Sequence, residues 1–209
     1  MSQLIACKNQ KGIVLAADAK ALDFDTAGNV HEYTVERLVQ LNDTTAVLAG
    51  GAVAGTHMAE GLKRFVVEEK LSDVEAVYDA ALPFLASEYE QFMRKSCEFM
   101  PLDPVHHVHF VIAGRKDNDR HNPFRLYFLW TKRKLPQLDG DEIGSAFAVP
   151  RLLRVEYRLS RLAGENAPLD RVLSEVSLAL ERQAESQEDV AGPFAYAVID
   201  ESGFRDLSE

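Results

Sequence analysis

Cysteine is scarce in this chain, which excludes a small protein held together by disulfides. The two cysteines, Cys7 and Cys97, are too few for a disulfide framework and form no Cys-x-x-Cys pair. This usage favours a reducing compartment. We expect both thiols to be inert packing residues, with a reactive Cys97 as the less favoured alternative, because buried unreactive cysteine is the norm.

Positive charge and long apolar runs are also in short supply. Lys and Arg number 23 against 33 Asp and Glu, for a formal net charge of −10, whereas nucleic-acid binding needs clustered basic residues. We expect the one basic run, Lys132-Arg133-Lys134, to form a hairpin turn. No apolar run approaches the ~20 residues that span a bilayer, and the first residues do not resemble a signal peptide. We therefore expect a cytoplasmic protein with neither nucleic-acid nor membrane partners.

The spacing of apolar residues predicts strands and helices in alternating blocks. Strands are expected at 4–8, 13–17, 37–41 and 45–49, then helices at 52–70 and 72–97, strands at 106–114, 124–131 and 142–147, helices at 149–163 and 168–188, and a strand at 194–199. Loops or turns are expected at 23–33, 100–104, 117–123 and 138–140. No repeat or linker divides the chain, so we expect a single domain over 1–209 of the α/β (α+β) class, with two facing sheets between two helical layers.

The N-terminus has the residue type of a nucleophile. Removal of Met1 ahead of the small Ser2 would leave a free α-amine beside the serine hydroxyl. Such a residue holds nucleophile and base together, because an α-amine with a pKa of about 7.7–8.0 accepts the hydroxyl proton near neutral pH. A serine at the second position is common, so this feature predicts a function only together with others.

Three segments supply those other features. The run GIVLAAD, residues 12–18, brings Asp18 sixteen positions after Ser2, and RLVQLND (37–43) and AVLAGGAVAG (46–55) follow. This arrangement resembles the proteasome β-subunit family of N-terminal-nucleophile (Ntn) hydrolases, in which an N-terminal nucleophile, an Asp and a Lys-led strand have a similar order. Late in the chain, PFAYAVID is similar to a further family strand. The resemblance implies the Ntn-hydrolase fold, a four-layer αββα sandwich.

The same resemblance implies a role for five residues. Ser2 would attack an amide carbonyl, Asp18 would orient the α-amine and Arg37 would tune it. The backbone N–H of Gly50 would stabilise the oxyanion, and Ser145 would help to hold the amine. No cofactor and no metal is implied.

The implied partners are a peptide or small amide substrate and further copies of the chain. We also take the apolar stripe of Leu62, Phe65 and Val66 to favour a homo-oligomer, because it is longer than one sheet layer needs. The resemblance also allows an ATP-dependent unfoldase as a partner, which the sequence does not identify.

One departure from the family divides the functional hypotheses. Arg37 stands where the family has its catalytic Lys, and a guanidinium stays protonated, so it cannot transfer a proton. The alternative to a hydrolase is therefore a catalytically silent, proteasome-like structural subunit. Serine in place of the usual threonine keeps the hydroxyl chemistry. Lys20, two residues after Asp18, is either a solvated lysine or a further contact of the site.

Two groups of side chains leave metal binding as a weaker alternative. His106, His107 and His109 lie close together, and 107 and 109 share one face of a strand, but no third ligand is evident. The acidic residues Glu185, Glu188 and Asp189 fit no EF-hand loop. We favour a polar strand face or an interface for the first group and a solvated helix end for the second.

Overall fold

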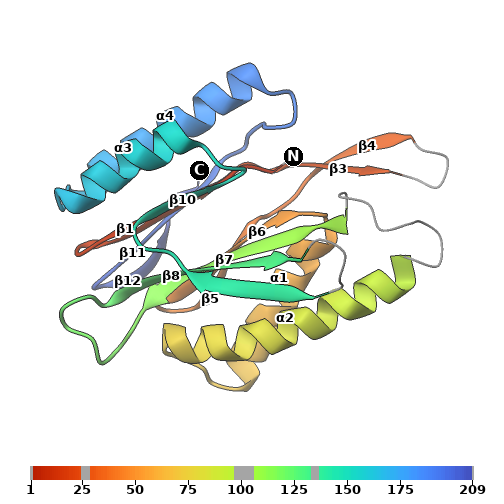
Figure 1. The fold of residues 1–209 in the computed structure, drawn as a ribbon, viewed down its shortest axis with the longest axis horizontal. Helices are drawn as coiled ribbons and strands as arrows, with labels where there is room; N and C mark the ends of the chain where they lie inside the picture. Colours follow the sequence, from red (N-terminus) through yellow and green to blue (C-terminus); the bar gives the residue numbers. More distant parts are fainter. Residues whose placement is uncertain (1, 25–28, 97–105, 133–136, 209) are drawn as a thin grey trace.

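The computed structural model describes residues 2–24, 29–96, 106–132 and 137–208 (Figure 1). Cys97, the expected loop at 100–104 and the Arg133-Lys134 turn lie outside these ranges. The described residues form four helices and two five-stranded antiparallel sheets, with a separate two-stranded hairpin. The predicted mixed α/β class is confirmed.

The first sheet contains both ends of the described chain. Its strand order is β10-β1-β2-β11-β12, comprising Ala146–Val149, Leu4–Asn9, Gly12–Ala17, Ala195–Asp200 and Gly203–Asp206. Strands β1 and β2 are buried along their whole length, as expected of near-continuous apolar runs in the middle of a sheet. Ser2 and Gln3, which precede β1, are therefore buried as well.

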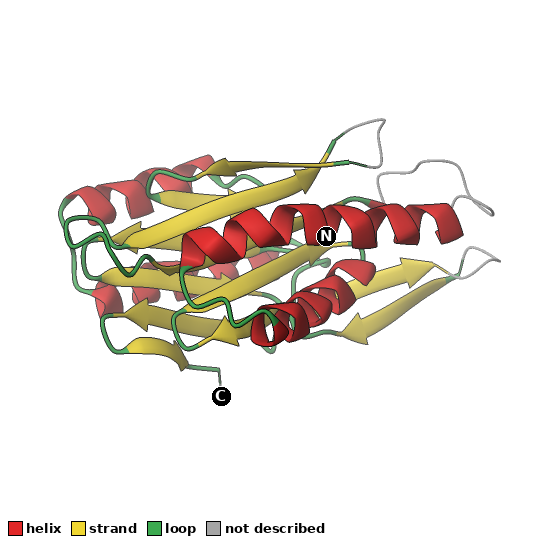
Figure 2. Ribbon diagram, turned by 90° about the horizontal axis from the view of Figure 1, so that it is seen from below, coloured by secondary structure: helices red, strands yellow, loops and turns green. Residues whose placement is uncertain are grey.

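The second sheet and the helices surround this centre. The sheet order is β5-β6-β7-β8-β9, comprising Leu38–Asn42, Thr45–Gly51, Val108–Arg115, Phe124–Thr131 and Leu138–Glu142. Helices α1 (Ala54–Glu68) and α2 (Val74–Ser96) pack on its outer face, as Figure 2 shows from their side, and α3 (Leu153–Gly164) and α4 (Leu169–Ser186) pack on the first sheet. Three separate apolar clusters fill the space under α1 and α2, between the two sheets, and under α3 and α4.

Three of the predicted segments differ from the structure. The expected loop at 23–33 includes a hairpin of β3 (Lys20–Phe24) and β4 (Val30–Thr34), with Lys20 opposite Thr34. All five residues of β4 are exposed, so burial imposed no apolar alternation there. The expected turn at 138–140 is part of β9, and the expected strand at 142–147 is divided between β9 and β10, which belong to different sheets. Strand β9 is a polar edge strand, whose sequence carries little strand signal.

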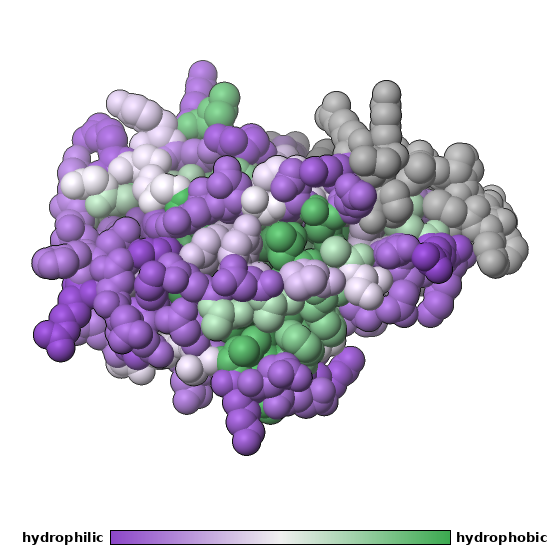
Figure 3. All heavy atoms as spheres, turned by 60° about the horizontal axis from the view of Figure 1, so that its bottom comes forward, coloured by the Kyte–Doolittle hydropathy of each residue, from purple (hydrophilic) through white to green (hydrophobic). Residues whose placement is uncertain are grey.

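The apolar stripe of α1 is buried within the chain and does not require a partner copy. Leu62 and Val66 are fully buried against the second sheet and α2. Phe65 stacks on Phe84 of α2 with ring centroids 4.8 Å apart. The stripe therefore gives no support to a homo-oligomer, although an apolar area is visible on the mostly hydrophilic face of Figure 3. Within the described ranges, no helix is long and apolar enough to cross a membrane.

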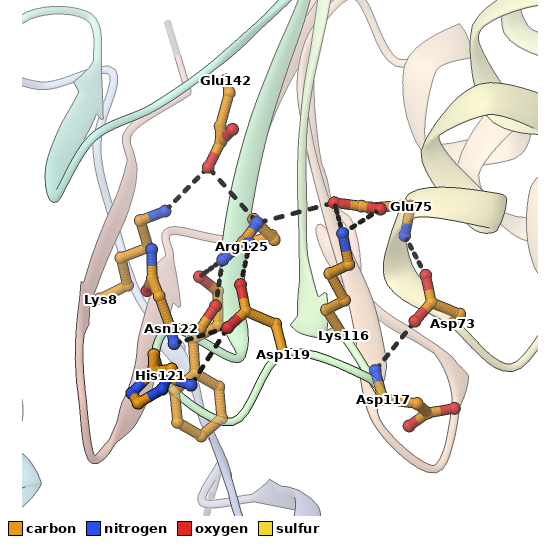
Figure 4. A network of polar contacts seen from close by, with 11 residues as sticks. Lys8, Asp73, Glu75, Lys116, Asp117, Asp119, His121, Asn122, Arg125 and Glu142 are labelled. Atoms are coloured by element: carbon orange, nitrogen blue, oxygen red, sulfur yellow. Dashed lines mark hydrogen bonds and ion pairs between the residues drawn. The ribbon is translucent and has the colours of Figure 1, made fainter.

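A network of charged residues ties the layers together at the end of the sheets where β1 finishes (Figure 4). Arg125 of β8 lies 2.7 Å from Asp119, 3.7 Å from Glu142 and 3.8 Å from Glu75 of α2. Lys8 of β1 reaches the same Glu142 at 3.2 Å. The network thus links both sheets and α2 far from Ser2.

Candidate active site

Ser2 lies where the start of β1 meets the end of β6. Its Oγ accepts a hydrogen bond of 2.9 Å from the backbone N–H of Gly51. Gly50 passes so close that a Cβ built on it would lie 2.8 Å from Ser2 Oγ and 2.9 Å from Leu4 Cδ1. The absence of a side chain at Gly50 therefore leaves the room in which the Ser2 hydroxyl sits.

The amide that contacts Ser2 is that of Gly51, whereas the family resemblance implied Gly50. Ala49 N–H donates to Arg37 O and Ala52 N–H donates to His107 O, both at 2.8 Å. Successive amides of a strand point to opposite sides, so Gly50 N–H points toward β7, like that of Ala52, and Gly51 N–H points away from β7. Gly51 also has a φ of 85°, and a Cβ there would overlap the carbonyl of His107. Amide direction distinguishes Gly51 from Gly50, and it follows from the strand pairing in the structure.

Asp18 and Arg37 form a buried ion pair beside the start of β1. Asp18 directly follows β2 and Arg37 directly precedes β5, and Arg37 Nε lies 3.3 Å from Asp18 Oδ1. The two residues are 1% and 2% exposed. Gln3 N–H donates to the same Oδ1 at 2.8 Å, and the Arg37 guanidinium also donates to the carbonyls of Lys20 at 2.6 Å and Ala49 at 3.4 Å. The pair therefore fixes the backbone next to Ser2.

Burial and the ion pair shift the pKa of Asp18 in opposite directions, and they do the same to the pKa of Arg37. Burial raises the pKa of Asp18, while Arg37 and the backbone N–H groups of Gln3 and Lys20 lower it by a smaller amount. Burial lowers the pKa of Arg37, and Asp18 partly offsets this; the guanidinium nevertheless stays charged at neutral pH. Among the residues that the structure describes, Asp18 Oδ2 has no hydrogen-bond partner. It is an unused acceptor near the N-terminus.

His109 is a member of the site that the sequence analysis did not assign. It is the partner of Gly50 across β6 and β7, and its Cδ2 lies 3.1 Å from the position of a Cβ on Gly50. Burial, His107 and Arg37 lower the pKa of His109 to about 4, so the ring is neutral at pH 7. Only the strand register, which the sequence does not reveal, brings it to Ser2.

The structure does not bring Ser145 to Ser2. The carbonyl of Ser145 accepts the N–H of Lys8 at 2.7 Å, and its hydroxyl contacts Ser160 at 3.1 Å. Lys8 lies six residues after Ser2 on an extended strand, so Ser145 is about 20 Å from the nucleophile. Pro150 is much closer, because its carbonyl accepts the Gln3 side chain at 3.2 Å.

The other candidates also have defined surroundings. Lys20 Nζ pairs with Glu32 of β4 at 2.9 Å, so its side chain is engaged in the hairpin. In the described parts of the chain, no three His, Cys, Asp or Glu side chains are grouped to hold a metal ion, and this applies to the histidines of 106–109 and to the acidic residues of 185–189.

Known proteins are similar to this chain in structure. No protein-family model and no curated protein sequence matches the chain. Among solved structures, the chain is similar to Anbu (ancestral beta-subunit) from Yersinia bercovieri, with a TM-score of 0.68 over 99% of this chain and 87% of that chain. The sequence identity is 14%, so the similarity concerns the fold alone.

Proposed function

We propose that this chain is an N-terminal-nucleophile amidohydrolase or peptidase, in which Ser2 attacks an amide carbonyl after removal of Met1. In this proposal residues 1–209 are one proteasome-like Ntn domain, and its layers are the four-layer αββα sandwich. The observation that carries the proposal is the 2.9 Å contact between Ser2 Oγ and Gly51 N–H, next to the buried pair of Asp18 and Arg37. The fold similarity to Anbu supports it at the level of architecture.

The reaction begins with a bond between Ser2 Oγ and the amide carbon. The hydroxyl proton passes to the α-amine of Ser2, directly or through water, and the carbonyl oxygen becomes an oxyanion. Gly51 N–H, which donates a hydrogen bond to the Ser2 hydroxyl oxygen, is the donor for this oxyanion. Collapse breaks the C–N bond, the leaving amine takes the proton, and water then hydrolyses the ester on Ser2.

Asp18 and Arg37 act on the new α-amine. The positive charge of Arg37 disfavours a protonated amine nearby and so favours the free base. Asp18 Oδ2, which has no hydrogen-bond partner among the described residues, is available to orient the amine. Neither residue transfers a proton in this scheme, so an Arg in place of Lys is compatible with it.

A catalytically silent, proteasome-like structural subunit is the second candidate. The observation that favours it is the environment of Arg37, whose side chain is fully buried, forms an ion pair with Asp18 and donates hydrogen bonds to two backbone carbonyls. An arginine held in this way stabilises the fold whether or not a reaction occurs. In either case we propose that copies of the chain assemble with one another.

Intact mass spectrometry and active-site labelling test the proposal. We expect the purified chain to lack Met1, and an amide-directed electrophile to add one label to the wild type and none to Ser2→Ala, which keeps the α-amine but removes the attacking oxygen. Ser145→Ala is the matched control and should be labelled like the wild type. Retention of Met1, or equal labelling of Ser2→Ala, would exclude the hydrolase and favour the structural subunit.

A further inference from the structure

An apolar cavity of about 610 Å³ lies between the two sheets on the side of strands β8, β9 and β10. Its walls include three aromatic side chains, Phe128, Trp130 and Phe147, with Val149, Pro150 and Arg151 at one end. Strands β9 and β10 are the edge strands of their sheets. The cavity thus lies where the space between the sheets reaches the surface.

The second sheet connects this cavity to Ser2 by one row of paired residues. Gly50 of β6 is opposite His109 of β7, and His109 is opposite Trp130 of β8. Directly paired residues point to the same face of a sheet, so the row begins at the contact with Ser2 Oγ and ends in the cavity wall. The His109 ring also lies 6.5 Å from that of Phe128.

The first sheet makes a second connection from the opposite side. Leu4 of β1 is opposite Val149 of β10, and the side chain of Gln3 donates to the carbonyl of Pro150 at 3.2 Å. On this sheet, therefore, Gln3 and Leu4, which follow Ser2, contact or pair with Pro150 and Val149 of the cavity lining. The cavity lining does not itself include Ser2, and along the second sheet Trp130 is two strand spacings, about 10 Å, from Gly50.

The lining is suited to a flat apolar group. Phe128 stacks on Trp130 at 5.1 Å, with 17° between the rings, and lies 4.5 Å from Phe147. The Arg151 guanidinium lies 5.2 Å from the centre of the Phe147 ring and is held by Glu156 at 2.6 Å. Ring faces and edges favour another aromatic ring.

The charged residues at the edge of the cavity disfavour a negatively charged ligand. Asp141 and Glu142 belong to the cavity lining and are exposed, but Glu142 is paired with Lys8 and Arg125, just as Arg151 is paired with Glu156. A carboxylate on the bound group would therefore meet the negative charge of Asp141, while Arg151 of the lining is already paired with Glu156.

We propose that this cavity is the substrate subsite beside Ser2, and that it binds an uncharged apolar, above all aromatic, side chain adjoining the amide bond. This rests on the proposed function for the reaction that follows binding, but not for binding itself. A pocket of this size with a few polar groups at its rim is typical of small-molecule sites.

The fluorescence of Trp130, the single tryptophan of the chain, measures binding without any reaction. In Ser2→Ala, N-acetylphenylalanine amide should change the emission saturably, and N-acetylglycine amide should bind at least about tenfold more weakly. Val149→Phe, which narrows the cavity, should weaken binding of the phenylalanine compound about tenfold. Leu178→Phe, which adds the same ring on α4, is the control and should bind like the parent. Phe147→Leu repeats the test by removing an aromatic wall.

The two proposals fail in different ways. Saturable binding that Val149→Phe or Phe147→Leu weakens supports the subsite even if no variant hydrolyses an amide, an outcome that would count only against the reaction. Equal binding of the two compounds, or no effect of either cavity variant, overturns the subsite and leaves Ser2 labelling as a separate result. If Val149→Phe changes the sedimentation coefficient and leaves probe binding unaltered, a second copy of the chain fills the cavity and the subsite is again overturned.

Discussion

Arg37 Nε lies 3.3 Å from Asp18 Oδ1, and this contact joins the end of β2 to the start of β5 with both side chains withdrawn from solvent. Removing one partner of a buried pair leaves an uncompensated charge, which costs about 3–5 kcal/mol. We therefore expect Arg37→Met to lower the free energy of unfolding by about that amount at pH 7. Urea unfolding followed by circular dichroism measures it.

The pH dependence of this variant follows from the raised pKa of Asp18. A carboxyl with a raised folded-state pKa adds stability below its unfolded value of about 3.9, and this stability is lost as the pH rises through the folded value. Without Arg37 the folded value rises further, so the loss between pH 4 and pH 7 should be larger in Arg37→Met than in the wild type. The double variant Asp18→Asn with Arg37→Met should abolish this extra loss, and its persistence there would contradict the assignment.

Gly50→Ala should displace the Ser2 hydroxyl without unfolding the protein. The new Cβ would lie 2.8 Å from Ser2 Oγ and 3.1 Å from His109 Cδ2, so one of these side chains must move. Misplacement of reacting atoms by about 1 Å costs on the order of a hundredfold in rate, and we expect labelling of Ser2 to slow by that factor. Gly144→Ala is the matched control, because nothing lies within 4 Å of its added Cβ. Equal labelling rates of the two variants would rule out close packing at Gly50.

His109 should make the protein less stable in mild acid. Its pKa is lowered to about 4 from the usual value of 6.5, so its stabilising contribution is present above pH 6.5 and is lost as the pH falls toward 4, because the unfolded chain takes up the proton first. The full shift corresponds to at most about 3 kcal/mol. His109→Gln should remove this part of the decline between pH 7 and pH 4.5 in urea unfolding. An NMR titration that places the His109 midpoint above pH 6 would refute the prediction.

The sequence predicted the elements with a clear apolar pattern. It missed the exposed and polar strands, because residues that are not buried need no such pattern. Strands β1 and β2 are buried throughout, and their apolar runs gave Asp18 its correct place beside the first residues of β1. The exposed strand β4 and the polar edge strand β9 carry no such pattern, so they were predicted as a loop and a turn.

The residues of the candidate site also differ in how well the sequence predicts them. Ser2, Asp18 and Arg37 are local to patterned segments, whereas His109 and Gly51 depend on strand register and amide direction. Ser145 was expected from resemblance, and the pairing of β10 with β1 places it at the other end of the strand.

Arg37→Lys separates the hydrolase from the structural subunit. A lysine in this buried position can lose its proton more readily than a guanidinium, because burial lowers the pKa of an amine toward neutrality. If Ser2 is the nucleophile, the substituted side chain adds a second proton acceptor next to the α-amine, and we expect amide hydrolysis to increase about tenfold or more.

The variant also loses the planar donors that bond Lys20 O and Ala49 O, so the free energy of unfolding should fall in either case. Rates are therefore measured at a temperature at which circular dichroism shows both proteins folded, with the double variant Ser2→Ala and Arg37→Lys as the background. Activity that stays at this background in both wild type and Arg37→Lys, together with reduced stability, identifies Arg37 as a structural residue of a silent subunit.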